Sequence, residues 1–311
     1  MYCSVQYLTV SEHALGQRLD NFLIKHLKGV PRSKIYRIIR KGEVRVNGRR
    51  SRPHDKLCLG DQVRIPPVHR WMSRDVCQAN PLSLNVQDLV LYEDSDLMVL
   101  NKPSGVAVHA GSGVAMGVIE WLRTERLDLD YLELVHRLDR ETSGVLLISK
   151  SRLLLLDLQR DWPLSQKYYF ALVYGQWDSA STGRIDLPLR EQRGQVGPRV
   201  VVDDLGKPSQ TDYRVMARFS GYTLLCMKPK TGRMHQIRVH LAAMGYPIVG
   251  DQRYAQVDQL AQSGAQVSPG LFLHARAVRL QCEFFKGKRF FKCPIPQMFK
   301  AFVQSLSLQN V

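Results

Sequence analysis

The sequence has no long apolar run. No stretch approaches the ~18 consecutive apolar residues that a membrane-spanning helix requires, and the opening segment MYCSVQYLTVSEH lacks the basic region and apolar run of a secretory signal. The six cysteines include no CxxC pair, which disfavours both a zinc site and a disulfide framework in a chain of 311 residues. We therefore expect a cytoplasmic protein whose thiols are reduced and mostly structural.

Acidic residues are also few. The chain has 28 Asp and Glu against 44 Lys and Arg, so its formal net charge is +16 at pH 7. Residues 1–75 hold 16 of the basic residues and 6 of the acidic ones. A positive charge of this size favours a polyanionic partner, either nucleic acid or an anionic membrane surface. Its concentration in the first part of the chain indicates a separate basic module.

The pattern of the basic module predicts two helices and a small sheet. Apolar residues recur at helical spacing in RLDNFLIKHLKG, and a second amphipathic helix follows Pro31 and ends at Gly42. Alternating apolar residues then lead into Asn47-Gly48, a tight-turn signal, and KLCLGDQVRI supplies a further strand.

Basic side chains gather on the second helix and the strand after it. The window 32–41 contains five of them and no acidic residue, so salt bridges within the helix cannot account for them. An ordinary solvated helix surface is the alternative interpretation, but the charge density favours contact with RNA phosphates. The residues expected to bind RNA are Arg32, Lys34, Arg37, Arg40, Lys41, Arg45 and Asn47.

These segments resemble a known domain. The run RLDNFL, then RSKIYRIIRKGEVRVNG and GDQVRI, is similar to an S4-type RNA-binding domain over residues 16–65. The resemblance implies a small α/β domain that binds structured RNA and supplies no chemistry. We place this domain at residues 1–67, a polar linker at residues 68–86 and a larger domain at residues 87–311.

The larger domain is expected to be α+β, with an extended, mainly antiparallel sheet flanked by helices and loops. Short apolar runs such as LVLY (89–92), LMVL (97–100) and VLLI (145–148) predict strands. HQIRVHLAAMG predicts a compact helix, and a last helix is expected from Gln297. Too few long helices separate the strands for a parallel α/β sheet.

Common nucleotide, zinc and hydrolase motifs are absent. HAGSGVAMG is neither GxGxxG nor a P-loop, and no serine lies in a GxSxG elbow. His235 and His240 are five apart rather than four, which disfavours a zinc helix. The remaining candidate is HRLDRETSG, where Asp139 lies between Arg137 and Arg140 just before an apolar strand. As a bare pattern, this segment fits a surface ion pair or a turn better than a site.

The order of several motifs changes that assessment. Taken together, the motifs given at the end of this paragraph resemble those of the RluA family of pseudouridine synthases, and the resemblance covers nearly the whole chain. The departures are small, because Met234 stands where Thr is usual and Ala255 where Gly is usual, and neither is a catalytic position. The motifs are NKPSG (101–105), HRLDRETSG (136–144), KYYFALVYG (167–175) and TGRMHQIRVHL (231–241), followed by GYPIVGD and LFLHA.

The resemblance implies a role for four residues. Asp139 is the catalytic aspartate, and Arg137 helps to move the target uridine out of its stack. Tyr169 lies next to the uracil, and Arg238 is the basic partner that keeps Asp139 ionised. The isomerisation of uridine exchanges no electrons and loses no group, so no cofactor, nucleotide or metal is expected.

The implied substrate is 23S ribosomal RNA, at several uridines near the peptidyl-transferase region, and the implied state is a monomer without a membrane partner. Two alternatives stay open. The first is a pseudouridine synthase that acts on transfer RNA, which the S4-type module disfavours. The second is a non-catalytic RNA-binding factor of ribosome assembly. A degenerate synthase would be expected to lose its catalytic aspartate, and this chain has Asp139.

Overall fold

The computed structural model describes residues 4–27, 30, 32–68, 85–111, 114, 116–194, 197–255, 270–283 and 285–306. The chain divides into two compact units, residues 1–81 with 151–153 and residues 82–150 with 154–311. The linker expected over residues 68–86 lies mostly outside the described residues. At its ends, Val68 packs in the core of the first unit, and Asn85 caps a short helix of the second.

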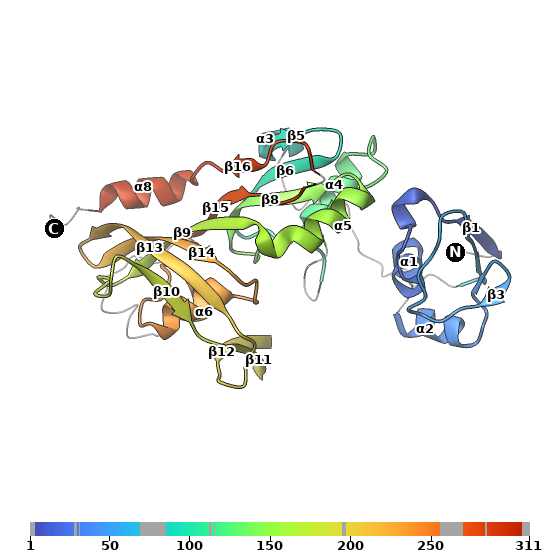
Figure 1. Ribbon diagram of the computed structural model, residues 1–311, viewed down its shortest axis with the longest axis horizontal. Coiled ribbons are helices and arrows are strands. Elements are labelled where there is room, and N and C mark those ends of the chain that lie inside the picture. Colours follow the sequence, from blue (N-terminus) through green and yellow to red (C-terminus); the bar gives the residue numbers. More distant parts are fainter. Residues whose placement is uncertain are drawn as a thin grey trace. The chain divides into compact units, whose positions relative to one another are not determined.

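The first unit packs two helices against a four-stranded antiparallel sheet of order β1-β4-β2-β3 (Figure 1). Asn47 and Gly48 both have positive φ and form the two-residue turn that the sequence predicts. Buried leucines of the first helix and isoleucines of the second fill the core. The elements are β1 (Gln6–Thr9), the 3-10 helix η1 (Glu12–Ala14), α1 (Leu19–His26), α2 (Arg32–Arg40), β2 (Arg45–Val46), β3 (Arg49–Arg50) and β4 (Gln62–Ile65).

The second unit is built on one long sheet of order β10-β13-β14-β9-β15-β8-β6-β5, to which β16 adds beside β15 and β7 beside β8. The pairing of β15 with β8 is parallel, and the other pairings are antiparallel. This arrangement confirms the expected α+β class. The strands are β5 (Val90–Glu93), β6 (Leu97–Lys102), β7 (Glu133–Leu134), β8 (Ser143–Ser149), β9 (Gln166–Tyr174), β10 (Thr182–Asp186), β13 (Gln210–Phe219), β14 (Tyr222–Pro229), β15 (Leu273–Arg279) and β16 (Phe290–Lys292).

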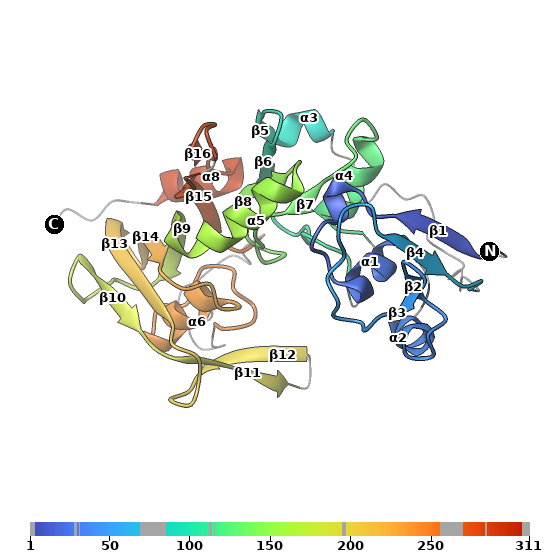
Figure 2. The same ribbon diagram turned by 45° about the vertical axis from the view of Figure 1, so that its right-hand side comes forward.

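Helices cover this sheet, and a separate ribbon lies beside it. The strands β11 and β12 form a separate two-stranded sheet, and they lie next to α6 (Figure 2). Among the described residues, no helix is long and apolar enough to span a membrane. The remaining elements are α3 (Val86–Leu89), α4 (Val118–Glu125), α5 (Arg152–Asp161), η2 (Trp162–Leu164), β11 (Leu189–Gly194), β12 (Gly197–Val202), α6 (Gln236–Ala243) and α8 (Gln297–Ser305).

The central strands are apolar without interruption because both of their faces are buried. On β8, Val145 and Leu147 pack with leucines of α5, whereas Leu146 and Ile148 pack with residues of α4. Strand β6 alternates between the same two clusters. A strand between two helical layers needs no polar face, which explains the runs from which the strands were predicted.

The start of β8 requires glycine. Gly144 has a φ of +117°, and a Cβ there would lie 2.3 Å from the carbonyl oxygen of Ala275 on the parallel neighbour β15. Strand β8 therefore approaches β15 directly after the HRLDRETSG loop. This approach brings the loop beside Leu273, the first residue of β15, at one edge of a pocket.

Candidate active site

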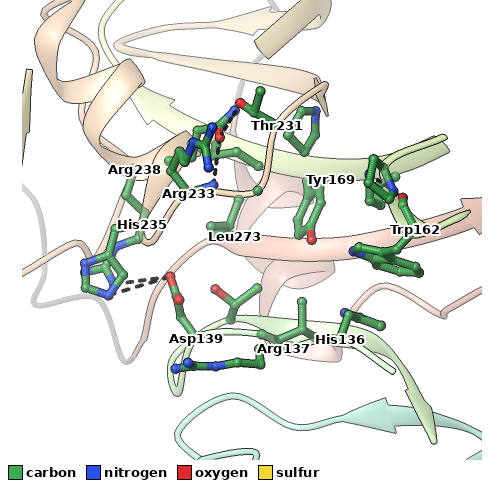
Figure 3. Close-up of a pocket in the computed structure, with 18 of the residues that line it drawn as sticks. His136, Arg137, Asp139, Trp162, Tyr169, Thr231, Arg233, His235, Arg238 and Leu273 are labelled. Carbon is green, nitrogen blue, oxygen red and sulfur yellow. Dashed lines mark hydrogen bonds and ion pairs between the residues drawn. The ribbon is translucent and has the colours of Figure 1, made fainter. Parts of the chain in front are cut away.

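A pocket of about 810 Å³ opens in the second unit, and four segments distant in sequence form it (Figure 3). They are the loop between β7 and β8, the end of α5 and the η2 turn with the start of β9, the loop between β14 and α6, and Leu273, and His109 from the segment between β6 and α4 also lines the pocket. His235 and Arg238 lie at one end of this pocket, and Trp162 with His136 lies at the other (Figure 3).

Asp139 lies in a turn that the chain holds from two sides. The amide of Thr142 donates to the carbonyl of Asp139 at 3.1 Å, which closes the turn. From the NKPSG segment, Ser104 Oγ donates to the carbonyl of Glu141 at 2.6 Å. Arg140 donates back through Nε to the carbonyl of Gly105 at 2.9 Å. Arg140 is thereby directed to a different loop, and the side chain of Asp139 stays partly exposed in the pocket.

Lys102 connects these two segments through a fully buried ammonium group. Its Nζ donates to the carbonyls of Pro103 at 2.8 Å, Val106 at 2.7 Å and Arg140 at 2.9 Å. Burial lowers the pKa of Lys102 to about 7, although the negative charges of Glu141 and Asp139 oppose this shift. Lys102 thus fixes the backbone of the residue that follows Asp139.

Two nitrogen groups face the same oxygen of Asp139. His235 Nε2 and Arg238 Nη1 each lie 3.8 Å from Oδ2, and Figure 3 shows both contacts as dashed lines to one carboxylate oxygen. The structure therefore brings Arg238 to Asp139, as the resemblance implies. The close partner of Arg238 is a different residue, however. Its Nε and Nη2 donate to the two carboxylate oxygens of Asp251, each at 2.8 Å.

The Arg238–Asp251 pair is buried and serves as an anchor. The side chains of Arg238 and Asp251 are 8% and 1% exposed, and Asp251 also accepts from the amides of Arg253 and Tyr254. A bidentate pair of this kind fixes the plane of the guanidinium group. Nη1 is then the nitrogen left to face Asp139.

Tyr169 stands on β9 beside the same carboxylate. Burial, together with the negative charge of Asp139, raises the pKa of the Tyr169 phenol well above its usual value of 10. At neutral pH the side chain is therefore a protonated phenol with an aromatic face, suited to contact with a base rather than to proton abstraction.

The opposite end of the pocket is aromatic and basic. The rings of His136 and Trp162 stack with centroids 4.3 Å apart, and Lys167 Nζ lies 5.3 Å from the Trp162 ring. Burial lowers the pKa of His136 to about 3, so this histidine is neutral. Arg137 is exposed on the same loop and makes no side-chain hydrogen bond or ion pair with another described residue. Its guanidinium group is thus available to a ligand.

In the first unit, the residues expected to bind RNA differ in their surroundings. Arg37 and Arg40 are exposed on α2, whereas Lys41 lies 4.0 Å from Glu43. The side chain of Asn47 is engaged inside the domain, because it donates to Asp61 and accepts from the amide of Gln62. Arg45 donates to the carbonyl of Gly48, Lys34 is half-buried on α2, and the side chain of Arg32 lies outside the described residues.

Three residues that hold Asp139, its loop or its partner Arg238 were not predicted as part of a site. His235 was considered as a zinc ligand with His240 and rejected, yet it faces Asp139, while His240 is buried against Ser209 and Thr211. Lys102 and Asp251 belong to the family motifs NKPSG and GYPIVGD, and these motifs are the feature of the sequence from which both residues could have been found. Among the described residues, no group of three or more His, Cys, Asp or Glu side chains could hold a metal ion.

Each of the two domains matches a known protein family. Residues 96–243 match the model of the RNA pseudouridylate synthase family, and residues 17–63 match that of the S4 domain. Ribosomal large subunit pseudouridine synthase C of Yersinia pestis is 50% identical over 283 residues, which cover 89% of this chain and 88% of that protein. The protein of the same name from Vibrio vulnificus is 45% identical over 308 residues, or 97% and 96% of the two chains. The chain belongs to the pseudouridine synthase family.

Solved structures agree with this assignment at the level of the fold. Human RNA pseudouridylate synthase domain containing 4 covers 72% of the synthase and 95% of its own chain, with a TM-score of 0.57 at 24% identity. Human RNA pseudouridylate synthase domain containing 1 covers 74% and 92%, with a TM-score of 0.58 at 23% identity. The family models and the bacterial relatives, rather than these structures, show that the synthase is an isomerase with an S4 domain in front of its catalytic domain.

Proposed function

We propose that the synthase converts uridines of large-subunit (23S) ribosomal RNA to pseudouridine, with Asp139 as its catalytic carboxylate. The observation that carries this proposal is the composition of the pocket. Among the described residues that line it, Asp139 is the one carboxylate, and five Lys or Arg residues accompany it. The names of the bacterial relatives support the choice of large-subunit ribosomal RNA over transfer RNA.

The chemistry of the reaction explains why one carboxylate in the pocket is enough. The reaction breaks the bond between N1 of uracil and C1′ of ribose, turns the base and joins C5 to C1′. The proton of C5 is lost and N1 gains one, so atoms and electrons balance without a second substrate. A carboxylate can attack as a nucleophile or stabilise positive charge at the sugar, as in glycoside hydrolysis. Uracil delocalises the charge it leaves with and needs less help from an acid.

The neighbours of Asp139 have complementary roles in this proposal. Tyr169 holds the uracil by its aromatic face while the base turns. Arg238 keeps a positive charge close to the carboxylate, and Arg137 fills the space that the flipped uridine leaves in the RNA, where unstacking costs a few kcal/mol. The basic helix α2 of the S4 domain binds phosphates at a distance from the reaction.

The substitution Asp139→Asn tests the assignment. Asparagine has nearly the same shape but neither the charge nor the nucleophilicity, so turnover should vanish while the affinity for RNA persists. Turnover is measured as tritium released from RNA that carries [5-³H]uridine. The matched control is Asp178→Asn, an exposed carboxylate that accepts from Tyr246 outside the pocket, and it should retain full activity. Isomerisation by the Asp139→Asn variant would exclude the proposed role.

The substrate is tested separately. Large-subunit ribosomal RNA and transfer RNA transcripts are offered to the same enzyme, and we expect release of tritium from the first. Release from transfer RNA alone would favour the alternative substrate, and release from neither by the unaltered enzyme would favour a non-catalytic assembly role. Mapping pseudouridines in ribosomal RNA from cells that lack the synthase would identify the target uridines.

A further inference from the structure

His235 has an unusual backbone conformation that directs its ring into the pocket. It precedes α6 with a φ of +53°, in the left-handed region that residues other than glycine seldom occupy. Such a conformation costs free energy and persists only where the surroundings hold it, which occurs most often at functional sites. Here the surroundings are buried and polar.

The side-chain amide of Gln236 holds the loop in front of His235. Its oxygen accepts from Thr231 Oγ1 at 2.8 Å and from the amide of Arg233 at 3.0 Å. Its nitrogen donates to the carbonyl of Gln210 and to Thr211 Oγ1, both at 2.9 Å. All of the polar atoms of this buried amide are thus bonded, and the loop between β14 and α6 is attached to β13.

The hydroxyl of Tyr254 and the carboxylate of Asp139 together indicate which nitrogen of His235 carries the proton. The hydroxyl oxygen of Tyr254 lies 2.7 Å from His235 Nδ1 and accepts from the amide of Val200 at 3.3 Å. The Val200 amide supplies one proton to this oxygen, which leaves the hydroxyl proton free to point to Nδ1. Nδ1 then accepts, and the neutral imidazole carries its proton on Nε2, the nitrogen that faces Asp139 at 3.8 Å.

The surroundings of His235 favour this neutral form. Burial lowers the pKa of His235, while Asp139 and Asp251 oppose the shift and Arg238 and Arg253 add to it. The other tautomer would place the lone pair of Nε2 opposite a carboxylate oxygen, which is electrostatically unfavourable.

We infer that His235 is a positioning residue for Asp139, with Tyr254 fixing its tautomer. Together with Arg238 Nη1, the Nε2–H group faces Oδ2 of Asp139, so Oδ1 is the oxygen that reacts. This inference rests on the proposed role of Asp139. The turn around Asp251 couples the two groups, because Asp251 accepts from Arg238 and from the amide of Tyr254. The Tyr254 ring is buried in one cluster with residues of β11, β12 and α6.

Substitutions at position 235 separate the Nε2–H donor from the rest of the ring. Asparagine tolerates the left-handed conformation and retains a polar atom near Nδ1, but it has none near Nε2. Glutamine places an amide N–H near the position of Nε2. We expect His235→Asn to lower kcat by about tenfold, a change in transition-state free energy of about 1.4 kcal/mol, with KM unchanged, because the N–H group that faces Oδ2 at 3.8 Å is lost. His235→Gln should recover part of the loss.

Tyr254→Phe tests the second step, because it removes the hydroxyl and keeps the ring that lies 5.1 Å from the Arg238 guanidinium. It should lower kcat by about fivefold alone and have no further effect in the His235→Asn background. Tyr246→Phe, which removes a hydroxyl bonded to Asp178 outside the pocket, is the matched control and should behave as the unaltered enzyme.

A readout independent of activity completes the test. Nitrogen-15 NMR of the full-length synthase should show the Nε2–H tautomer for His235, and a mixture of tautomers in Tyr254→Phe. An Nδ1–H tautomer in the unaltered enzyme would overturn the inference, as would an unchanged kcat in His235→Asn. Losses in the two variants that multiply in the double variant would show that Tyr254 does not act through His235. Activity retained by Asp139→Asn would instead refute the proposed function.

Discussion

Lys102 offers a test of how the loop that carries Asp139 is held. The substitution Lys102→Met replaces it with an unbranched apolar side chain and removes the donor that three carbonyl oxygens share. Each carbonyl oxygen left without a donor costs about 1–3 kcal/mol. The variant also avoids the cost of burying a positive charge, and the pKa of Lys102 measures that cost.

The loss of hydrogen bonds and the removal of the buried charge can be distinguished because only the second depends on pH. Lys102 has its pKa lowered from 10.5 to about 7 on folding. Between these values the unfolded chain binds more protons at this residue than the folded chain, so the free energy of unfolding rises with pH. The rise is about 1.4 kcal/mol per pH unit. Below pH 7 both states are protonated, and the full penalty for the buried charge is present.

The assay is urea unfolding of the synthase and of Lys102→Met at pH 7 and at pH 9. Tryptophan fluorescence reports on the catalytic domain, which contains Trp121, Trp162 and Trp177. We expect the variant to be less stable at pH 9 by about 3 kcal/mol or more, and the difference to shrink by up to about 2.7 kcal/mol at pH 7. A difference that is the same at both pH values would refute the reasoning. It would show that the three carbonyls hold the ammonium form at its usual pKa.

Three further predictions follow from other contacts. Asp251→Asn leaves the buried Arg238 charge without its partner and should lower the free energy of unfolding by about 3–5 kcal/mol in urea, whereas Asp212→Asn, at a more exposed pair with Arg184, should cost about 1 kcal/mol or less. Arg37→Ala should reduce the slope of log K against log salt, where K is the binding constant for ribosomal RNA in filter binding, by about 0.7–0.9. Lys56→Ala, at an exposed lysine outside α2, serves as its control. Equal slopes for Arg37→Ala and the unaltered synthase would contradict a phosphate contact. Tritium release should persist in EDTA with RNA that folds without magnesium, and its loss would point to a metal.

The elements that the sequence predicts correctly are those buried on both faces or held by a strong local signal. Strands β6 and β8 lie between two helical layers and therefore appear as apolar runs. Strand β10, at one edge of the sheet, exposes most of its residues, and no apolar run marks it or its neighbour β13.

Only those site residues that lie in recognisable family motifs could be predicted from the sequence. Asp139 was found through the motif HRLDRETSG, and Arg238 was found through the motif TGRMHQIRVHL. That Arg238 bonds most closely to Asp251 depends on how the chain returns after α6, which spacing does not encode. His235 and His240 are both polar residues of one short motif. His235 precedes α6 in a left-handed backbone conformation that directs it to the pocket, whereas His240 lies within the helix and faces the interior.

The residues that face Asp139 are themselves held by buried residues outside the pocket, so substitutions outside the pocket can affect catalysis. Arg238 and His235 each face Asp139 while a further buried group holds them. For Arg238 that group is Asp251, and for His235 it is Tyr254. Loss of such a holder leaves the pocket lining unchanged in composition, but it alters which atom faces the carboxylate. Substitutions outside the pocket at these holders should therefore lower kcat more than the affinity for RNA, because the S4 domain and the exposed basic residues still bind phosphates.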